Sequence, residues 1–150
     1  MKEITYKDIL LINQLCLFSD EPFLVTDENR VRSALGNQFA PYDRDELSIA
    51  SVYKSLVINH GFMNGNKRTA VIALYLFSKM IDNPIKINDQ ELASFTYRLA
   101  DEGGSLIDVN EISDIVFKNN NHEVDKDIDI KNETTKFIKE HEWLMKELGK

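Results

Sequence analysis

Hydrophobic residues recur at intervals of three and four along most of the chain, which is the spacing of an amphipathic helix. Residues that commonly cap helices precede several of these stretches, as Thr5, Asn88 or Asp89, and Asp108 do. Residues 51 to 98 contain no alternating pattern of the kind that strands show. The predicted class is therefore all-α. The helices that the spacing predicts cover residues 5–18, 26–36, 43–60, 66–80, 88–102, 108–117 and 132–148.

The predicted helix over residues 66–80 differs from the others because its middle has no polar side. Val71 to Phe77 are apolar on nearly every face of a helix. A helix of this kind is buried by neighbours all around it. We therefore expect it at the centre of a helical bundle.

The composition changes near residue 119, where a polar and acidic stretch begins that is typical of a linker. We divide the chain into a domain of residues 1–118 and an extension of residues 119–150, which ends in one amphipathic helix. An isolated helix of that length is marginal in water, so we expect it to dock on its own domain or on a second copy. The apolar members of this helix are Phe137, Ile138, Trp143, Leu144 and Leu148.

The charge of the chain limits its partners. The 25 acidic residues outnumber the 18 lysines and arginines, and the net charge is −7. Direct nucleic-acid binding is therefore not expected, because it needs a basic surface. A local electropositive pocket can still hold one small anion. No apolar run reaches membrane-spanning length and the first residues do not form a signal sequence, so we expect a cytoplasmic protein without a membrane partner.

The chemistry is concentrated between the third and fourth predicted helices, at His60-Gly61-Phe62-Met63-Asn64-Gly65-Asn66-Lys67-Arg68. Unpaired backbone N–H groups at the start of a helix bind anions well. Lys67 and Arg68 are unfavourable at a helix N-terminus unless an anion offsets their charge. The imidazole of His60 suits a general base near neutral pH. The same residues also fit a plain turn with two surface cations and a structural histidine, and spacing alone does not decide between the two interpretations.

This loop resembles the signature of the Fic/Doc (death-on-curing) family, which runs His, any, Phe, any, Asp/Glu, Gly, Asn, Gly/Lys, Arg. Lys67 resembles the death-on-curing branch, because members that transfer AMP have glycine there. Val71 stands where those members keep a second arginine, which favours the same branch. The positions that match the signature are His60, Phe62, Gly65, Asn66 and Arg68.

The resemblance implies a Fic-fold helical bundle with a short flap at residues 39–42 and a role for each loop residue. His60 is then the catalytic base, and Phe62 anchors the loop in the core. Lys67 and Arg68 neutralise charge in the transition state of phosphoryl transfer. The residues expected to bind the phosphates of ATP are Gly65, Asn66, Lys67, Arg68 and Thr69.

The function that the resemblance implies is that of a toxin from a toxin–antitoxin pair. Death-on-curing toxins transfer the γ-phosphate of ATP to a hydroxyl of a translation factor, elongation factor Tu, and a cognate antitoxin neutralises them. Two alternatives stay open. One is a Fic enzyme that transfers AMP, and the other is a catalytically weakened or inactive Fic-fold module that binds a nucleotide or a protein.

Asn64 is the position that separates an active enzyme from an inactive module. The family has an acidic residue there, which holds Mg²⁺, and asparagine is its counterpart in this chain. Magnesium prefers charged oxygen ligands, and an amide oxygen is neutral and weaker. Asn64 is therefore the expected metal ligand. Either the phosphates and water hold the metal mostly by themselves, or activity is reduced or lost.

Overall fold

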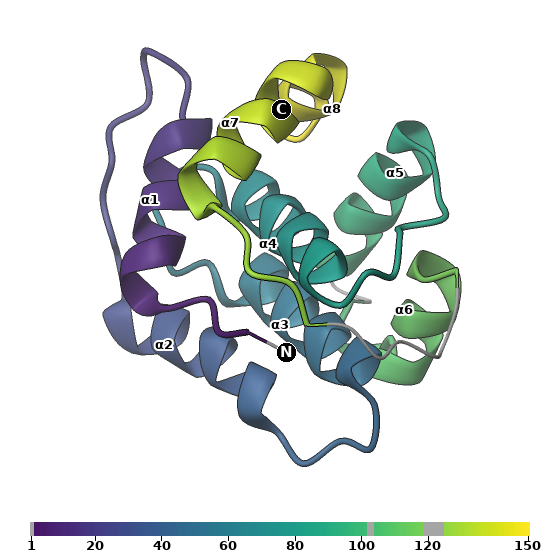
Figure 1. Cartoon of the computed structure of the whole chain (residues 1–150). Coiled ribbons are helices and arrows are strands. Elements are labelled where there is room, and N and C mark those ends of the chain that lie inside the picture. The colour runs from purple at the N-terminus through teal and green to yellow at the C-terminus, as the bar shows by residue number, and fades with distance from the viewer. Residues whose placement is uncertain (1, 102–103, 119–124) are drawn as a thin grey trace.

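The computed structural model describes residues 2–101, 104–118 and 125–150. Within these ranges the regular structure is helical, with two isolated antiparallel bridges, Val25–Phe62 and Ile85–Phe117. The predicted all-α class is confirmed (Figure 1). The helices are α1 (Tyr6–Cys16), α2 (Glu28–Gly36), α3 (Asp45–Asn59), α4 (Asn66–Met80), α5 (Asp89–Ala100), α6 (Val109–Val116), α7 (Ile130–Glu140) and α8 (Glu142–Glu147), with 3₁₀ turns at Asn37–Phe39 and Gly104–Leu106.

Local capping chemistry sets several helix starts. The Thr5 hydroxyl accepts a hydrogen bond from the Asp8 backbone, and the Asp8 carboxylate accepts one from the Thr5 backbone. This reciprocal pair satisfies two N–H groups that the helix itself cannot pair. Asn88 begins α5 in the same way. The starts predicted from Thr5 and Asn88 are therefore confirmed, together with their physical cause.

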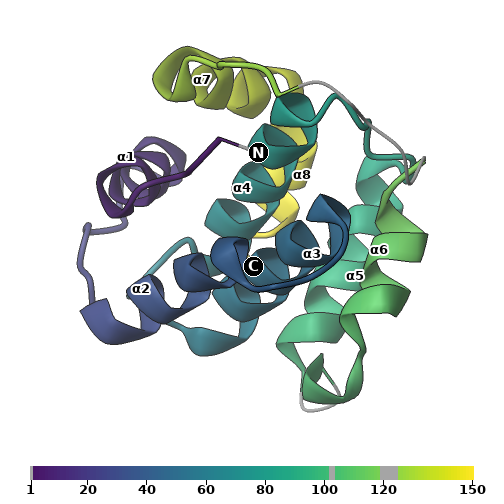
Figure 2. The same ribbon diagram turned by 60° about the horizontal axis from the view of Figure 1, so that its bottom comes forward.

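Helix α4 occupies the centre of the bundle, as its uniform apolar sequence predicts. Every residue from Val71 to Leu74 is fully buried, and so are Leu76 and Phe77. Helices α3 and α1 pack most extensively on α4, and α5 and α7 add further contacts. Both views show α4 between the side formed by α1 and α2 and the side formed by α5 and α6 (Figures 1 and 2). Besides the two ends of α4, only Tyr75 is partly exposed, on the side that faces α7.

The single helix predicted for residues 132–148 is wrong, because the chain bends at His141. His141 has φ −123° and ψ 43°, which no helical residue adopts. Its ring stacks on Phe137 with 4.1 Å between centroids, and its Nδ1 lies 2.9 Å from Asp89 Oδ2. These tertiary contacts explain the bend, which lets α7 pack on α1 and α4 while α8 packs on α5.

The extension shares the core of the preceding domain. Phe137, Leu144 and Leu148 are buried, and the Phe137 ring lies 4.6 Å from the Tyr75 ring of α4. The extension therefore docks on its own domain, whereas Trp143 stays 49% exposed. Lys126 donates a backbone hydrogen bond to Met80, so the end of the predicted linker is attached to α4. Residues 119–124 of that linker lie outside the described residues.

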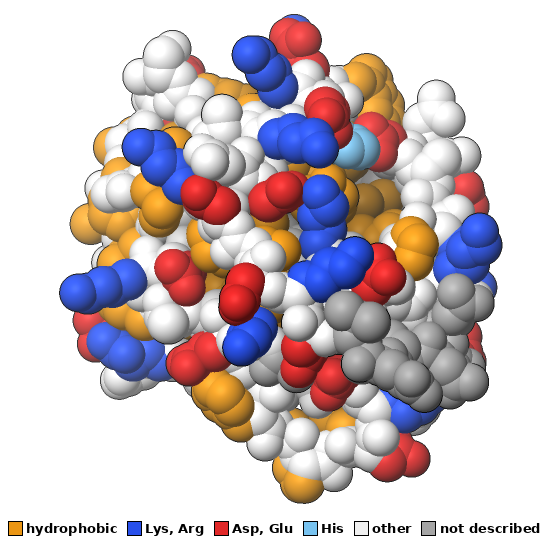
Figure 3. All heavy atoms as spheres, in the orientation of Figure 1, with side chains coloured by type: hydrophobic (Ala, Val, Ile, Leu, Met, Phe, Trp, Pro, Cys, Tyr) orange, Lys and Arg blue, Asp and Glu red, His pale blue; other side chains and the backbone are white. Residues whose placement is uncertain are grey.

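A hollow about 300 Å³ in volume remains where α7 meets α4 and α5, and Tyr75, Leu92 and Phe137 contribute to its walls. Figure 3 shows this apolar hollow, whose lining also includes His141. Acidic and basic side chains are interspersed over the rest of the same face (Figure 3). None of the described helices combines the length and apolar character needed to cross a membrane.

The predicted flap is an exposed turn. Residues 37–39 form the 3₁₀ turn, and the chain then leads through Pro41 to the start of α3 at Asp45. Phe39 is 66% exposed and Tyr42 is 40% exposed, so two aromatic rings face solvent. No strand pairing involves this turn in the described part of the chain. Its role in contacting a target stays a prediction.

We expect Phe137→Ala to lower the free energy of unfolding by about 3 kcal/mol, because it leaves a cavity under α7. Trp143→Ala serves as the matched control, since its ring is half exposed, and it should cost about 1 kcal/mol or less. Urea unfolding followed by circular dichroism measures both. Equal losses for the two variants would contradict the packing described for α7.

Candidate functional site

The loop between α3 and α4 begins and ends on residues in the left-handed conformation. His60 ends α3 with φ 51° and ψ 49°, and Gly65 precedes α4 with φ 77°. Glycine adopts this conformation without strain, whereas a residue with a side chain does so at a cost. The left-handed backbone at His60 turns the chain sharply out of α3. The loop is therefore a defined turn, and the strained residue in it is the predicted base.

A second segment, residues 22–27, fixes the loop from outside. Thr26 donates a backbone hydrogen bond of 2.9 Å to Gly61, and Met63 donates one of 2.9 Å to Leu24. These bonds flank the Val25–Phe62 bridge, and the Phe62 ring is buried in the core. The predicted anchoring role of Phe62 is confirmed. Gly61 is required by packing, because a Cβ there would lie 2.4 Å from Val31 Cγ2.

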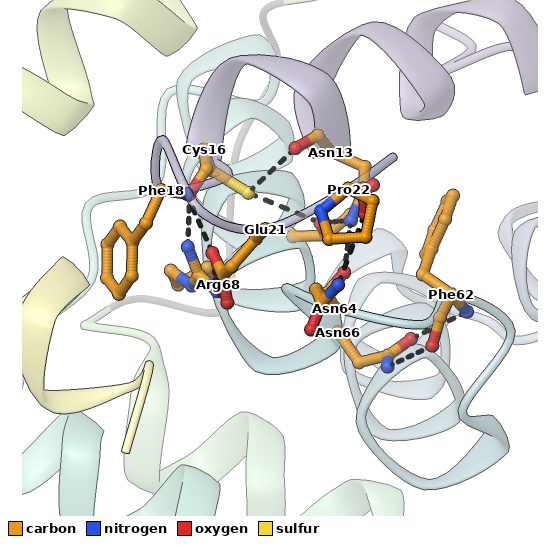
Figure 4. Close-up of polar contacts among 10 residues, drawn as sticks. Asn13, Cys16, Phe18, Glu21, Pro22, Phe62, Asn64, Asn66 and Arg68 are labelled. Carbon is orange, nitrogen blue, oxygen red and sulfur yellow. Dashed lines mark hydrogen bonds and ion pairs between the residues drawn. The ribbon is translucent and has the colours of Figure 1, made fainter. Parts of the chain in front are cut away.

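The side chain of Asn66 holds the loop closed. Its Nδ2 donates to the Phe62 carbonyl at 2.7 Å, and its Oδ1 accepts from the Phe62 amide at 3.0 Å. Both ends of the amide are therefore used within the loop (Figure 4). The predicted contact of Asn66 with a phosphate stays a prediction, and the backbone N–H of Asn66 is the group left to make it.

The start of α4 has no side-chain cap. Gly65 occupies the N-cap position and provides no side chain to accept from the first turn. The backbone N–H groups at the start of a helix have no partner within it, and they attract anions together with the helix dipole. Lys67, which is half-buried in this turn, adds a positive charge. These features are the ones that favour an anion at a helix start, and the predicted binding of phosphate here stays a prediction.

Arg68 lies inside the protein, where the sequence pattern suggested a surface cation. Its side chain is 1% exposed, and its Nη2 donates to both carboxylate oxygens of Glu21 at 2.8 Å. Its Nη1 donates to the Cys16 carbonyl, and the guanidinium stacks 4.0 Å from the centre of the Phe18 ring (Figure 4). Arg68 thus joins α4 to the end of α1. Its predicted contact with a phosphate stays a prediction.

Thr69 also faces the interior. It is fully buried, and its hydroxyl accepts a 3.0 Å hydrogen bond from Asn13 Nδ2. The same Asn13 nitrogen donates to the Asn64 carbonyl at 2.9 Å, so α1 supports the loop from below. The neighbouring Cys16 is buried, which raises the pKa of its thiol to about 11. A thiol with that pKa is protonated at neutral pH, which agrees with the expectation of a structural cysteine.

The polar side chains of His60 and Asn64 differ in their exposure and in their contacts. The His60 imidazole is exposed, and it makes no hydrogen bond or ion pair with the described residues. Its carbonyl accepts a hydrogen bond from the Thr26 hydroxyl at 3.2 Å, which steadies the backbone and leaves the ring free. Asn64 is half-buried, and its Nδ2 donates to the Pro22 carbonyl at 3.1 Å.

The described residues do not form a metal site of their own. No group of three or more histidine, cysteine, aspartate or glutamate side chains among them could hold a metal ion. Asn64, the predicted ligand, offers one neutral amide oxygen, and Mg²⁺ prefers charged oxygens. The loop therefore fits an anion well and a protein-held Mg²⁺ poorly.

The fold and the loop together define an all-α bundle whose central helix begins without a side-chain cap, with an exposed histidine at the other end of the preceding loop. The sequence model described as the Fic/DOC family matches residues 3–78, half of the chain, and the protein belongs to this family. No significant match appears among curated proteins or among solved structures. Proteins of the family are generally transferases for a nucleotide or phosphate, and they typically bind a nucleotide with a metal.

Several residues that shape the site were not predicted from the sequence. Glu21 balances the charge of Arg68, Asn13 supports the loop, and Phe18 stacks on Arg68. All three lie in or just after α1, about fifty positions before the loop. A carboxylate directly after a predicted helix is a weak signal, because it does not reveal which distant cation it will meet.

We expect Glu21→Gln to lower the free energy of unfolding by about 3 kcal/mol, because it leaves the buried Arg68 charge without its counter-ion. Asp20→Asn is the matched control, since Asp20 is the exposed neighbour and its replacement should change stability by at most about 0.5 kcal/mol. Urea unfolding at neutral pH compares the two. A Glu21 variant as stable as the control would show that the ion pair contributes nothing net.

Proposed function

We propose that the protein is an ATP-dependent phosphotransferase of the death-on-curing type that acts as the toxin of a toxin–antitoxin pair. Its expected acceptor is a hydroxyl of a translation factor, elongation factor Tu, and its expected regulator is a cognate antitoxin. The observation that carries the proposal is the uncapped start of α4, with Lys67 in its first turn and the free His60 at the other end of the same loop.

His60 acts as the general base in this proposal. It takes the proton from the acceptor hydroxyl, whose oxygen forms a bond to the γ-phosphorus of ATP. The bond between that phosphorus and the bridging oxygen breaks, and ADP leaves with the electron pair. An exposed imidazole without an internal partner is suited to this role, because an incoming hydroxyl can reach it.

The start of α4 binds and orients the phosphates. Charge shifts over the phosphate oxygens during transfer, and fixed N–H dipoles stabilise that charge without rearranging. The ammonium of Lys67 adds a full positive charge at the same end of the helix. The closed loop that Asn66 maintains keeps these groups in place before the ligand arrives.

The position of Val71 supports phosphate transfer over AMP transfer. AMP-transferring members keep a second arginine at this position, in addition to the glycine that they have in place of Lys67. Val71 is fully buried against the core here, so it offers a ligand neither charge nor a hydrogen bond. A site whose accessible cation is Lys67 suits transfer of the γ-phosphate, as in death-on-curing toxins, better than transfer of AMP.

A non-catalytic Fic-fold binding module is the second candidate, and Asn64 favours it. A neutral amide that already bonds to Pro22 is a weak magnesium ligand. When Mg²⁺ accompanies ATP, it supplies positive charge for the phosphates, and in this chain Asn64 is the loop side chain that could contribute an oxygen to it. If the protein is a phosphotransferase, its activity should therefore respond only weakly to Mg²⁺. If it is a binding module, it should show no transfer activity at all.

We expect His60→Asn to lower phosphate transfer at least a hundredfold, since a general base contributes about 10²- to 10⁴-fold. Asparagine tolerates the left-handed backbone, so the variant should fold as the parent does. The assay supplies elongation factor Tu with γ-labelled or α-labelled ATP and follows the label on the protein. Label arriving from α-labelled ATP alone would assign the chain to AMP transfer, and no label from either would favour the binding module.

Asn64→Asp should lower the Mg²⁺ concentration at which transfer is half-maximal, because it adds a charged oxygen to the loop. The carboxylate cannot donate to Pro22, so the variant should also lose about 1 kcal/mol of stability. Asn64→Ala is the control that loses the Pro22 bond without adding charge. A magnesium titration of transfer compares them, and equal responses of both variants would place the metal away from this residue.

A further inference from the structure

The two cations of the loop each rest on an aromatic ring, and both rings touch the end of the extension. Lys67 Nζ lies 5.3 Å from the centre of the Tyr97 ring, which belongs to α5. The Tyr97 hydroxyl donates a hydrogen bond to the backbone carbonyl of Glu147 in α8. On the other side, Gly149 lies against Phe18. The Phe18 ring is the one that stacks on Arg68 (Figure 4).

We propose that Tyr97 is a positioning residue of the phosphate site: its ring holds the Lys67 ammonium beside the first turn of α4, and its hydroxyl ties that ring to α8. The proposal rests on the proposed function of Lys67 as a phosphate-binding cation. The extension then has a role in the site itself, because it fixes the ring on which the cation rests.

The physical argument begins with the freedom of a lysine side chain. An ammonium on a flexible stem loses considerable entropy when a ligand fixes it, and a contact that restricts it beforehand reduces that loss. The face of an aromatic ring attracts a cation within about 6 Å, and the 5.3 Å separation meets this condition. Donation of the phenol proton makes the ring richer in electrons, which strengthens the attraction.

The contacts of Gly149 support the same arrangement from the Phe18 side. A Cβ at position 149 would lie 2.4 Å from Phe18 Cε2, so only a residue without a side chain fits against the ring as it stands. The tail of the chain thus packs against the ring that covers Arg68. The lysine and the arginine of the loop are both held through aromatic contacts with residues 147–149.

The test compares Tyr97 and Tyr75, whose rings each contact a lysine of α4. Tyr97→Leu removes the ring beneath Lys67, and Tyr75→Leu removes the ring that lies 5.5 Å from Lys79 near the opposite end of α4. Calorimetric titration of the full chain with ATP should give about a two- to fivefold weaker affinity for Tyr97→Leu. It should give an unchanged affinity for Tyr75→Leu, whatever either variant loses in thermal stability.

Tyr97→Phe keeps the ring and loses only the bond to Glu147, so it should recover most of the affinity. In the transfer assay, Tyr97→Leu should raise KM for ATP more than it lowers kcat, because it loosens a binding group and leaves His60 intact.

An affinity of Tyr97→Leu equal to the parent's, or a loss that Tyr75→Leu matches, would overturn the positioning role. Lys67→Ala separates this failure from that of the proposed function. If Lys67→Ala binds ATP normally, Lys67 is not a phosphate-binding cation and both proposals fail. If Lys67→Ala loses binding and Tyr97→Leu does not, only the positioning role fails.

Discussion

The structure depends on the burial of α4, whose middle turns lie in the core. A helix without a polar side must be covered all around, and four other helices of this small chain are used to cover it. The charged side chains of this helix therefore lie near its ends, as Lys67, Arg68 and Lys79 do. Its N-terminal end carries unpaired N–H groups and the positive end of the dipole, so the packing that buries α4 also decides where an anion can bind.

Arg68 shows what this arrangement demands of the first turn. A buried guanidinium is costly unless a carboxylate and further acceptors surround it, and Glu21, the Cys16 carbonyl and the Phe18 ring meet that need. All three come from α1 or the residues after it. The ion pair between Arg68 and Glu21 therefore holds the end of α1 against the loop. It leaves Lys67 as the charged side chain of the loop that a ligand can approach.

The sequence predicted what depends on neighbouring residues and missed what depends on distant ones. The caps at Thr5 and Asn88, the central position of α4 and the anchoring of Phe62 follow from patterns that span a few turns of chain. The break at His141 and the burial of Arg68 depend on Asp89 and Glu21, which are about fifty residues away. No local pattern identifies those partners, because an exposed cation and a buried one have the same sequence neighbours.

The loop itself combines both kinds of information. Its glycines and asparagines are typical of a turn. The turn has its observed shape, however, only because residues 22–27 and Asn13 support it. The strain of a left-handed His60 persists only where the surrounding structure enforces it. Here the Val25–Phe62 bridge and the hydrogen bonds between the Asn66 side chain and the Phe62 backbone hold the loop in the shape that enforces this strain. Packing does not require a histidine held in this way, because its ring bonds to none of the described residues and glycine would serve the backbone at that position; this supports the catalytic role proposed for His60.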